Sequence, residues 1–218
     1  MLSHAEENYL KAMFHLTTMA ESSNETGTNA LASYLDVTPA TVNDMLKKLK
    51  EKDLVSYEKY RKITLTQKGK DYAVDIVRRH RLWETFLYEK LDFSWDEVHE
   101  VAEQLEHIKS KKLIEQLEKF LDYPVTDPHG DPIPNAKGKI KYQKRKTLAE
   151  IPIGSICKLV AVKDTSASFL QYAMKIGLGL SSTIEILNRH EFDGSIEIKV
   201  NKSRSTVSLK FAENLFVV

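Results

Sequence analysis

The stretch that decides the fold reads NALASYLDVTPATVNDMLKKLK and covers residues 29–50. Apolar residues recur at helical spacing up to Leu35, and they do so again from Pro39 to Lys50. Thr38 is a favoured helix N-cap, and Pro39 takes the first helical position, where its missing N–H costs no hydrogen bond. The stretch therefore predicts two short helices joined by a tight turn.

A β-hairpin is predicted directly after these helices. LVSYEK (54–59) and KITLT (62–66) alternate apolar and polar residues on either side of a charged tip, Lys59-Tyr60-Arg61. A further helix is predicted at the N-terminal end, over residues 5–18. Helix, helix-turn-helix and hairpin, in that order, form a winged helix-turn-helix, which we expect to occupy residues 1–70.

The predicted secondary structure changes twice in the rest of the chain. Helical periodicity continues to residue 125, with helices predicted over 67–91, 94–106 and 110–121. Four prolines within residues 123–134 then break the pattern, and a Pro-rich, basic linker is predicted over 126–146. Residues 147–218 read as short strands around one helix, 167–176, which suggests an SH3-like β-barrel. The predicted fold class is mainly α with a small β component: a DNA-binding domain, a helical domain (71–125) and a barrel.

Composition narrows the functional class. The chain has 218 residues and a net charge of only +1, but residues 47–70 carry nine basic and three acidic residues, whereas 71–125 carry eight and thirteen. This opposition predicts a different partner for each region. No apolar run is long enough for a membrane span, the start lacks a signal-peptide pattern, and the single cysteine, Cys157, excludes an intramolecular disulfide framework. We therefore expect a cytoplasmic protein without a membrane partner.

The second helix of a helix-turn-helix presents its first residues to base edges in the major groove, and basic residues around it contact phosphates. Asn pairs with adenine, and Thr or Ala contacts the thymine methyl group. Asp44 is unfavourable so close to phosphates unless it accepts from a cytosine amine. The predicted DNA-binding residues are Thr38, Pro39, Ala40, Thr41, Asn43, Lys47, Lys48, Tyr60 and Arg61.

A second pattern indicates a metal site in the acidic region. His80 and Glu84 stand four residues apart on one predicted helix, and His99, Glu103, Glu106 and His107 follow on the next. At about 100° per residue, the latter four would share one stripe about 100° wide. Two facing stripes of imidazoles and carboxylates suit a divalent first-row cation.

Catalysis has little support in the sequence, so no enzyme activity and no small organic substrate are expected. The segment from His99 begins like a zinc-protease helix, but its fifth position is Glu103 rather than His. No Gly-rich phosphate loop is present, and Cys157 lies in an apolar strand as a small core residue would. One alternative stays open: a winged-helix regulator that senses a small organic ligand, with the His/Glu cluster structural.

The order of these parts resembles the diphtheria-toxin-repressor and manganese-transport-regulator family of metal-dependent transcriptional repressors, in its long form. The resemblance runs over most of the chain and rests on several motifs together. They are ENYL (7–10), TPATV (38–42), YEKYR (57–61), LTQKG (65–69), RHRL (79–82), EQLEH (103–107) and HGDPIP (129–134).

The resemblance implies a homodimer that binds a palindromic operator and represses metal-uptake genes when metal is bound. It also implies a C-terminal SH3-like domain of FeoA type. For this domain we consider two roles, an inert tether or a binder of a peptide such as the Pro-rich linker. A regulatory metal site would be formed by Asn8, Glu103, Glu106 and His107. An ancillary site would be formed by His80, Glu84 and His99.

The resemblance favours Mn²⁺, with Fe²⁺ as the other candidate. Iron-type members carry a soft Cys at the position of Glu103, and a carboxylate suits Mn²⁺ better. Manganese-type members usually have Asp at the position of Asn8, and short-form members have Glu at that of Lys11. Ser166 and Phe169 fall near the places where the family's SH3-like domain supplies ligands.

Overall fold

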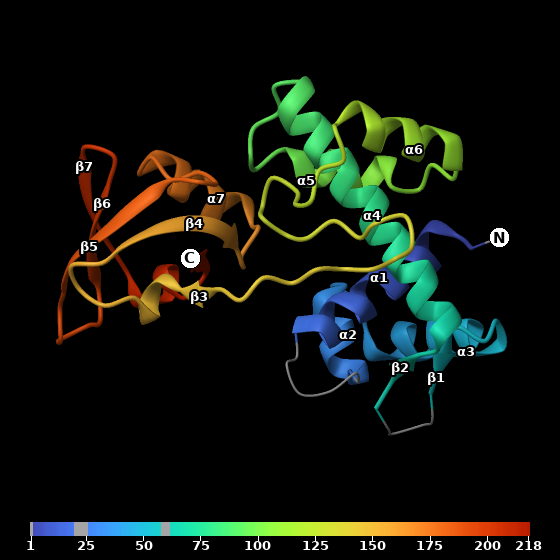
Figure 1. Cartoon of the computed structure of the whole chain (residues 1–218). Helices are drawn as coiled ribbons and strands as arrows, with labels where there is room; N and C mark the ends of the chain where they lie inside the picture. The colour runs from blue at the N-terminus through green and yellow to red at the C-terminus, as the bar shows by residue number, and fades with distance from the viewer. Residues whose placement is uncertain (1, 20–25, 58–61) are drawn as a thin grey trace. The chain divides into compact units, whose positions relative to one another are not determined.

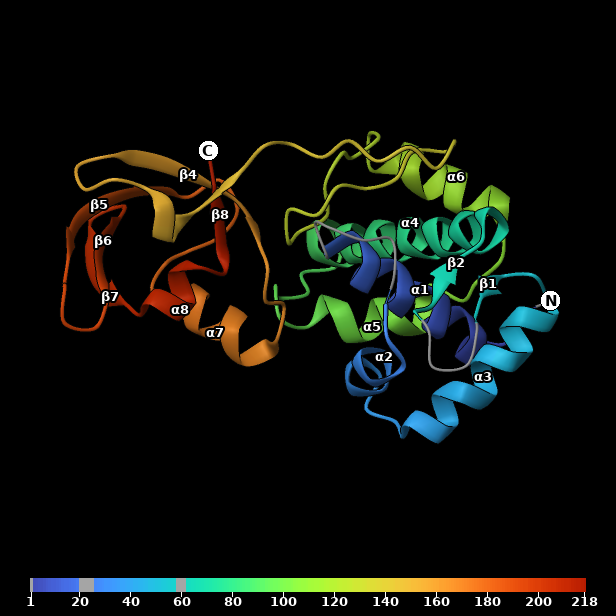
Figure 2. The ribbon, with the colours of Figure 1, turned by 90° about the horizontal axis from the view of Figure 1, so that it is seen from below.

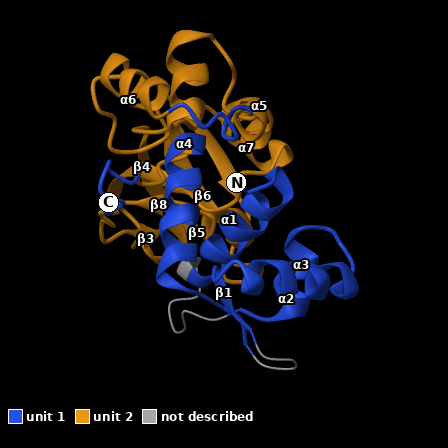
Figure 3. Cartoon of the chain, turned by 90° about the vertical axis from the view of Figure 1, so that its right-hand side faces the viewer, with its two compact units in different colours: residues 1–80, 105–110, 134–139 blue, residues 81–104, 111–133, 140–218 orange. Residues whose placement is uncertain are grey.

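A computed structural model describes residues 2–19, 26–57 and 62–218 (Figure 1). Tyr60 and Arg61, both predicted to contact DNA, lie outside the described residues. The chain divides into two compact units (Figure 3). Unit 1 comprises Met1–His80, Leu105–Ser110 and Pro134–Lys139, and unit 2 comprises Arg81–Gln104, Lys111–Ile133 and Ile140–Val218.

Unit 1 contains the helix-turn-helix that the opening stretch predicts. Helices α1 (His4–Met19), α2 (Thr28–Tyr34) and α3 (Pro39–Glu51) are visible in blue in Figure 1. The Thr38 hydroxyl accepts from the Thr41 N–H at 3.2 Å, so the predicted N-cap is present. Val42, Leu46 and Leu49 of α3 are buried, while its lysines lie on the opposite, exposed face.

The wing is a short antiparallel pair, β1 (Val55–Ser56) and β2 (Thr64–Leu65). Gly69, in the first turn of α4, packs directly against this pair: a Cβ there would come within 2.0 Å of the Leu54 carbonyl oxygen. The backbone of α4 can approach the wing so closely only because residue 69 has no side chain. A glycine thereby fixes where the long helix leaves the DNA-binding domain.

Three helices follow: α4 (Gln67–Lys90), α5 (Val98–Leu105) and α6 (Lys111–Phe120). The predicted helix over 94–106 is too long at both ends. Ser94 and Glu97 form a turn instead, in which the Ser94 N–H donates to the Glu97 carboxylate at 2.8 Å. At the other end the helix stops at Leu105, so Glu106 and His107 lie in a turn and not on the predicted helical stripe.

The C-terminal part of unit 2 is a six-stranded antiparallel sheet in the order β3-β8-β4-β5-β6-β7. Helices α7 (Ala167–Lys175) and α8 (Leu209–Ala212) contribute Leu170 and Phe211 to its core (Figure 2). The strands are β3 (Lys146–Thr147), β4 (Ile156–Val162), β5 (Thr183–Arg189), β6 (Ile196–Val200), β7 (Ser203–Val207) and β8 (Leu215–Val217), and a 3₁₀ helix covers Leu148–Glu150. Cys157 is buried in this core, as predicted, and its burial raises the pKa of the thiol.

Within unit 2, the sheet is attached to the helical segment by shared core packing. Trp95, from the turn before α5, is 3% exposed and belongs to the same hydrophobic core as the strands. Gln171 of α7 donates to Asp96 at 2.6 Å, next to that tryptophan. Among the described residues, no helix combines the length and apolar character needed to cross a membrane.

Candidate metal centres and DNA-binding face

The first group of candidate ligands lies in unit 1 and is centred on Glu106; we call Glu7, Asn8, Lys11, His80, Glu106 and His107 the Glu106 cluster. Glu106 is fully buried. Its carboxylate accepts from Lys11 Nζ, which lies 2.8 Å from both oxygens, and from His80 Nδ1 at 2.6 Å. Burial alone would raise the pKa of Glu106, but the hydrogen bonds and charges of His80 and Lys11 lower it below 4.5. The carboxylate is therefore ionised and already neutralised.

His107 is oriented by a second buried carboxylate. Its Nδ1 lies 2.6 Å from Glu7 Oε2, while Lys109 Nζ lies 2.8 Å from Glu7 Oε1. The ring of His4 stacks on His107 at a centroid distance of 4.0 Å. An ionised carboxylate can only accept, so Nδ1 is the donor, and in this tautomer the neutral ring would offer the lone pair of Nε2 to a metal.

Asn8 supplies the observation that tests whether a metal fits here. Its Oδ1 is buried and has no hydrogen-bond partner among the described residues. A buried amide oxygen without a donor is unusual and costly, and an unplaced ion is one explanation for it. An amide oxygen, a carboxylate and an imidazole nitrogen within unit 1 are a donor set that suits Mn²⁺ or Fe²⁺. The residues therefore fit a divalent cation.

The second group lies in unit 2; we call Glu84, His99, Asp127 and His129 the Glu84 cluster. Glu84 Oε1 lies 3.2 Å from His99 Nδ1 and 3.7 Å from His129 Nδ1. One ligand atom from each of Glu84, Asp127 and His129 lies within 4.8 Å of the others, and all three residues are buried. His129 Nε2 donates to the Trp95 carbonyl at 3.1 Å, which leaves Nδ1 directed toward Glu84.

The segment that carries Asp127 and His129 is held tightly in place. The Asp127 carboxylate accepts from the backbone N–H groups of His129 and Asp131. Gly130 has φ +85°, and a Cβ there would come within 2.0 Å of the Val160 carbonyl oxygen of β4. The His129 carbonyl accepts from Val162 N–H at 2.9 Å. This part of the predicted linker is thus buried against the sheet rather than free.

Protonation in the Glu84 cluster reflects crowded buried charge. Burial, followed by the charges of Glu84 and Asp131, raises the pKa of Asp127 to about 7, against the opposing charges of Arg81 and His129. Burial alone would lower the pKa of His129, but the Glu84 carboxylate, 3.7 Å from Nδ1, and the charge of Asp127 raise it. Protons therefore balance part of the negative charge of this cluster.

The comparisons with known proteins agree with this geometry. Three family models match in series: "Iron dependent repressor, N-terminal DNA binding domain" over residues 1–63, "Iron dependent repressor, metal binding and dimerisation domain" over 66–135, and "FeoA domain" over 146–218. A solved structure described as a manganese-dependent transcriptional repressor in complex with manganese is 34% identical. Its match covers 98% of this chain and 99% of that chain, with a TM-score of 0.85. The chain belongs to the iron-dependent repressor family.

Other members of the family are also similar. The structure of ScaR with bound Cd²⁺ is 33% identical, with a TM-score of 0.78, and the match covers 98% of each chain. The iron-dependent repressor IdeR of Mycobacterium tuberculosis is 33% identical over 129 residues, which are 59% of this chain and 54% of IdeR. The chain thus spans about half the length of the curated relatives it matches first.

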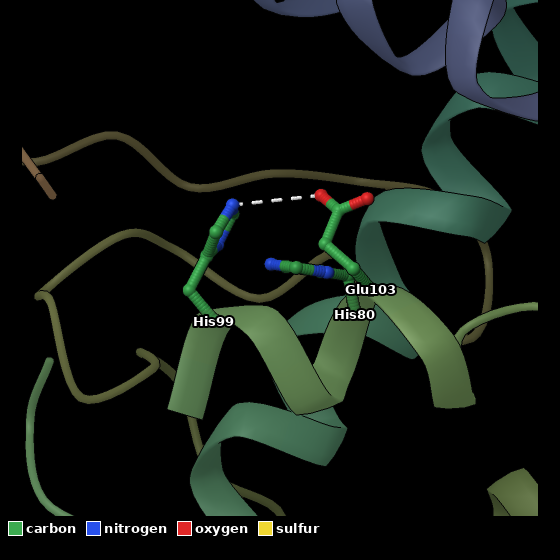
Figure 4. A group of neighbouring side chains, drawn as sticks. All are labelled: His80, His99 and Glu103. Carbon is green, nitrogen blue, oxygen red and sulfur yellow. Dashed lines mark ion pairs between the residues drawn. The ribbon is translucent and has the colours of Figure 1, made fainter. Parts of the chain in front are cut away.

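The metal-site residues that the family resemblance predicts for this chain lie partly in unit 1 and partly in unit 2. Asn8, Glu106 and His107 of the predicted regulatory site lie in unit 1, while Glu103 lies in unit 2, where it pairs with His99 at 3.5 Å. Figure 4 draws that pair together with His80. Of the predicted ancillary residues, Glu84 and His99 are in contact, whereas His80 donates to Glu106.

Sequence reasoning missed four residues of these clusters. Asp127 and His129 were assigned to a linker, although His129 begins one of the family motifs. In the sequence, Glu7 stands out only as part of the ENYL motif, and Lys11 only as a departure from short-form relatives. For Glu7 and Lys11 the missing information is the partner, because Lys11 and Glu106 are 95 residues apart in sequence.

The predicted DNA-binding residues of α3 lie mostly on an exposed face. Thr38, Pro39, Ala40, Thr41, Lys47 and Lys48 are exposed. Asp44, unfavourable beside phosphates, is paired with Lys47 at 3.0 Å. Asn43 Oδ1 accepts from the Tyr57 hydroxyl at 2.7 Å, so in bidentate pairing with N6 and N7 of an adenine this oxygen would be shared with Tyr57.

Proposed function

We propose that this protein is a metal-dependent repressor that binds DNA as a homodimer when Mn²⁺ occupies the Glu106 cluster. The proposal is supported by the family membership and by one observation above all: Asn8 Oδ1 is buried without a partner among the described residues, on the helix whose Glu7 and Lys11 contact His107 and Glu106. Mn²⁺ is favoured over Fe²⁺ because the candidate ligands are oxygen and imidazole nitrogen without a thiolate. Two copies related by a two-fold axis would read a palindromic operator in the cytoplasm.

Residues of the Glu106 cluster connect the DNA-binding domain to the metal. Asn8 lies on α1, which packs in the core of the DNA-binding domain through Leu10 and Met13, whereas Glu106 and His107 follow α5. A bound cation would supply positive charge between these segments. Asn8 would offer its amide oxygen, Glu106 a carboxylate oxygen and His107 its Nε2, while Glu7 accepts from Nδ1 and orients the ring.

For regulation, metal has to bind the DNA-competent state more tightly than the other state. A cation with equal affinity for both states would shift nothing. Coupling of 1–3 kcal/mol between two sites corresponds to roughly 5- to 150-fold in affinity. We therefore expect Mn²⁺ to tighten operator binding by a factor in that range.

The test begins with DNA selected from a random pool in the presence of Mn²⁺, followed by gel-shift titrations with Mn²⁺, Fe²⁺ and chelator. Glu106→Ala is expected to lose the metal response while remaining a dimer, because Glu106 is not an exposed residue. Glu100→Gln, at an exposed position of α5, is the matched control and should respond like the wild type. DNA binding that is indifferent to chelator would contradict the proposal and favour a regulator that senses an organic ligand.

A further inference from the structure

Lys11 occupies an unexpected place in the Glu106 cluster. It lies on α1, three residues after Asn8, and its side chain is 16% exposed. Its ammonium nitrogen lies 2.8 Å from both carboxylate oxygens of Glu106, whose side chain is 0% exposed. A lysine in this position binds both oxygens of a proposed metal ligand.

A divalent cation and the Lys11 ammonium would compete for the same lone pairs. His80 donates to Glu106 Oε2, and Lys11 contacts Oε1 and Oε2, so each oxygen already has at least one donor. Two positive charges a few ångströms apart repel strongly in a buried site. A metal that binds Glu106 therefore has to displace the ammonium, and the lost lysine contact is subtracted from the metal's binding energy.

Lys109 shows that a lysine on a buried carboxylate need not have this effect. It contacts Glu7 at 2.8 Å, but Glu7 orients His107 and is not a proposed ligand. Lys52 is a third case: its Nζ lies 2.6 and 2.8 Å from the oxygens of Glu6, which neighbours the cluster in sequence without belonging to it. Among these three lysines, Lys11 is the one whose partner is a proposed ligand.

We propose that Lys11 is an internal cation that fills the metal position of the Glu106 cluster and thereby sets the metal affinity of the repressor. The inference rests on the proposed function. In the metal-free protein Lys11, together with His80, neutralises the buried carboxylate of Glu106, which stabilises that state. Metal loading exchanges one cation for another, so the threshold concentration for Mn²⁺ is higher than the ligands alone would give.

The experiment compares Mn²⁺ titrations of the full-length wild type, Lys11→Met, Lys11→Arg and Lys52→Met, with free Mn²⁺ followed by its electron paramagnetic resonance signal. Lys11→Met, which keeps the apolar stem without the charge, should tighten Mn²⁺ binding by about tenfold or more, since a competing buried charge is removed. Its metal-free form should melt at a lower temperature than the wild type. Lys11→Arg keeps the cation and should stay near the wild type, as should Lys52→Met.

The outcomes separate the two proposals. A Lys11→Met protein that is folded and binds Mn²⁺ equally or more weakly than the wild type overturns the role of Lys11 and leaves the proposed function intact. A wild type that binds no Mn²⁺ overturns both. If Lys11→Met fails to fold without metal, Lys11→Gln, which keeps an amide donor for Glu106, has to show the same tightening, and its failure to do so overturns the inference.

Discussion

The Glu106 cluster and the Glu84 cluster both bury carboxylates and imidazoles, but they balance the negative charge in different ways. In the Glu106 cluster, Lys11 contacts Glu106 and Lys109 contacts Glu7. In the Glu84 cluster, Glu84 contacts the rings of His99 and His129, and the pKa of His129 is raised. The counter-charges of the Glu106 cluster are two lysine ammoniums beside the histidine rings, whereas those of the Glu84 cluster are imidazoles and the Arg81 guanidinium, which lies 3.4 Å from Asp127.

This difference has a consequence for metal binding. An ammonium has no lone pair at neutral pH, so it can only move away when a metal arrives. An imidazolium can lose its proton and become a ligand without moving. Binding of a metal to Glu106 therefore requires Lys11 to leave, whereas Glu84 can bind a cation with its two histidine partners in place.

The largest effect is expected from Trp95→Ala, which removes the support of the Glu84 cluster. Trp95 is buried in the core of the C-terminal sheet, donates to the Pro128 carbonyl at 2.7 Å and stacks on His129. Truncation of a buried tryptophan should lower the free energy of unfolding by about 3–5 kcal/mol. Urea denaturation measures this loss. Phe192→Ala, at a fully exposed site, is the control and should change stability by less than about 0.5 kcal/mol.

A more selective change is Glu84→Gln, which should weaken metal binding at the Glu84 cluster alone. We expect a loss at least as large as the roughly 10- to 100-fold caused by removing an outer-shell partner of a ligand. Isothermal titration should then show that the variant binds one Mn²⁺ ion fewer with high affinity than the wild type does. Glu106→Gln should abolish binding of the other ion, and a variant that lost both at once would show that the clusters do not bind independently.

Lys109→Met tests whether the two lysines of the Glu106 cluster differ as their partners suggest. Lys109 is about one third exposed and contacts Glu7, so its removal loosens the support of His107 without freeing a metal ligand. Mn²⁺ binding should weaken by less than about fivefold, the equivalent of the 0–1 kcal/mol of a partly exposed ion pair. The direction is opposite to that expected for Lys11→Met. Equal tightening in both variants would mean that overall charge, rather than displacement, governs affinity.

The fold of the DNA-binding domain could be predicted from short-range signals in the sequence. The cap at Thr38, the proline at position 39 and the alternation in the hairpin act over a few residues, and the structure has these elements where they were predicted. The helix predicted over residues 94–97 is wrong. Helical periodicity extends through these residues, but Trp95 packs into a core built from residues more than fifty positions away.

The features that could not be predicted from the sequence depend on contacts between residues far apart in the chain. Proline content predicted a linker, yet Asp127 satisfies backbone N–H groups inside the segment and Arg81 donates to the Pro132 carbonyl at 2.6 Å, so the chain there can be buried. Strands β3 and β8 are too short for an alternation to be recognised, and they exist because they pair with each other and because β8 also pairs with β4. Ligand types could be predicted from spacing, but not which carboxylate each lysine or histidine contacts.

The smallest effect is expected from Gln171→Leu, which probes the polar part of the support of the Glu84 cluster. Hydrogen bonds from Ser94 and then Gln171 lower the pKa of Asp96 below 3.8. A carboxyl with a lowered folded-state pKa stabilises the fold above its unfolded pKa, and this contribution is lost as pH falls through the folded value. Because Asp96 is largely solvated, the Gln171 bond should contribute less than about 1 kcal/mol at neutral pH.

The gap in melting temperature between wild type and Gln171→Leu should therefore be small at about pH 7 and should close as pH falls below the lowered pKa of Asp96, where its carboxyl is protonated in both proteins. A gap that persists unchanged in acid would assign the effect to packing of α7 rather than to the charged hydrogen bond.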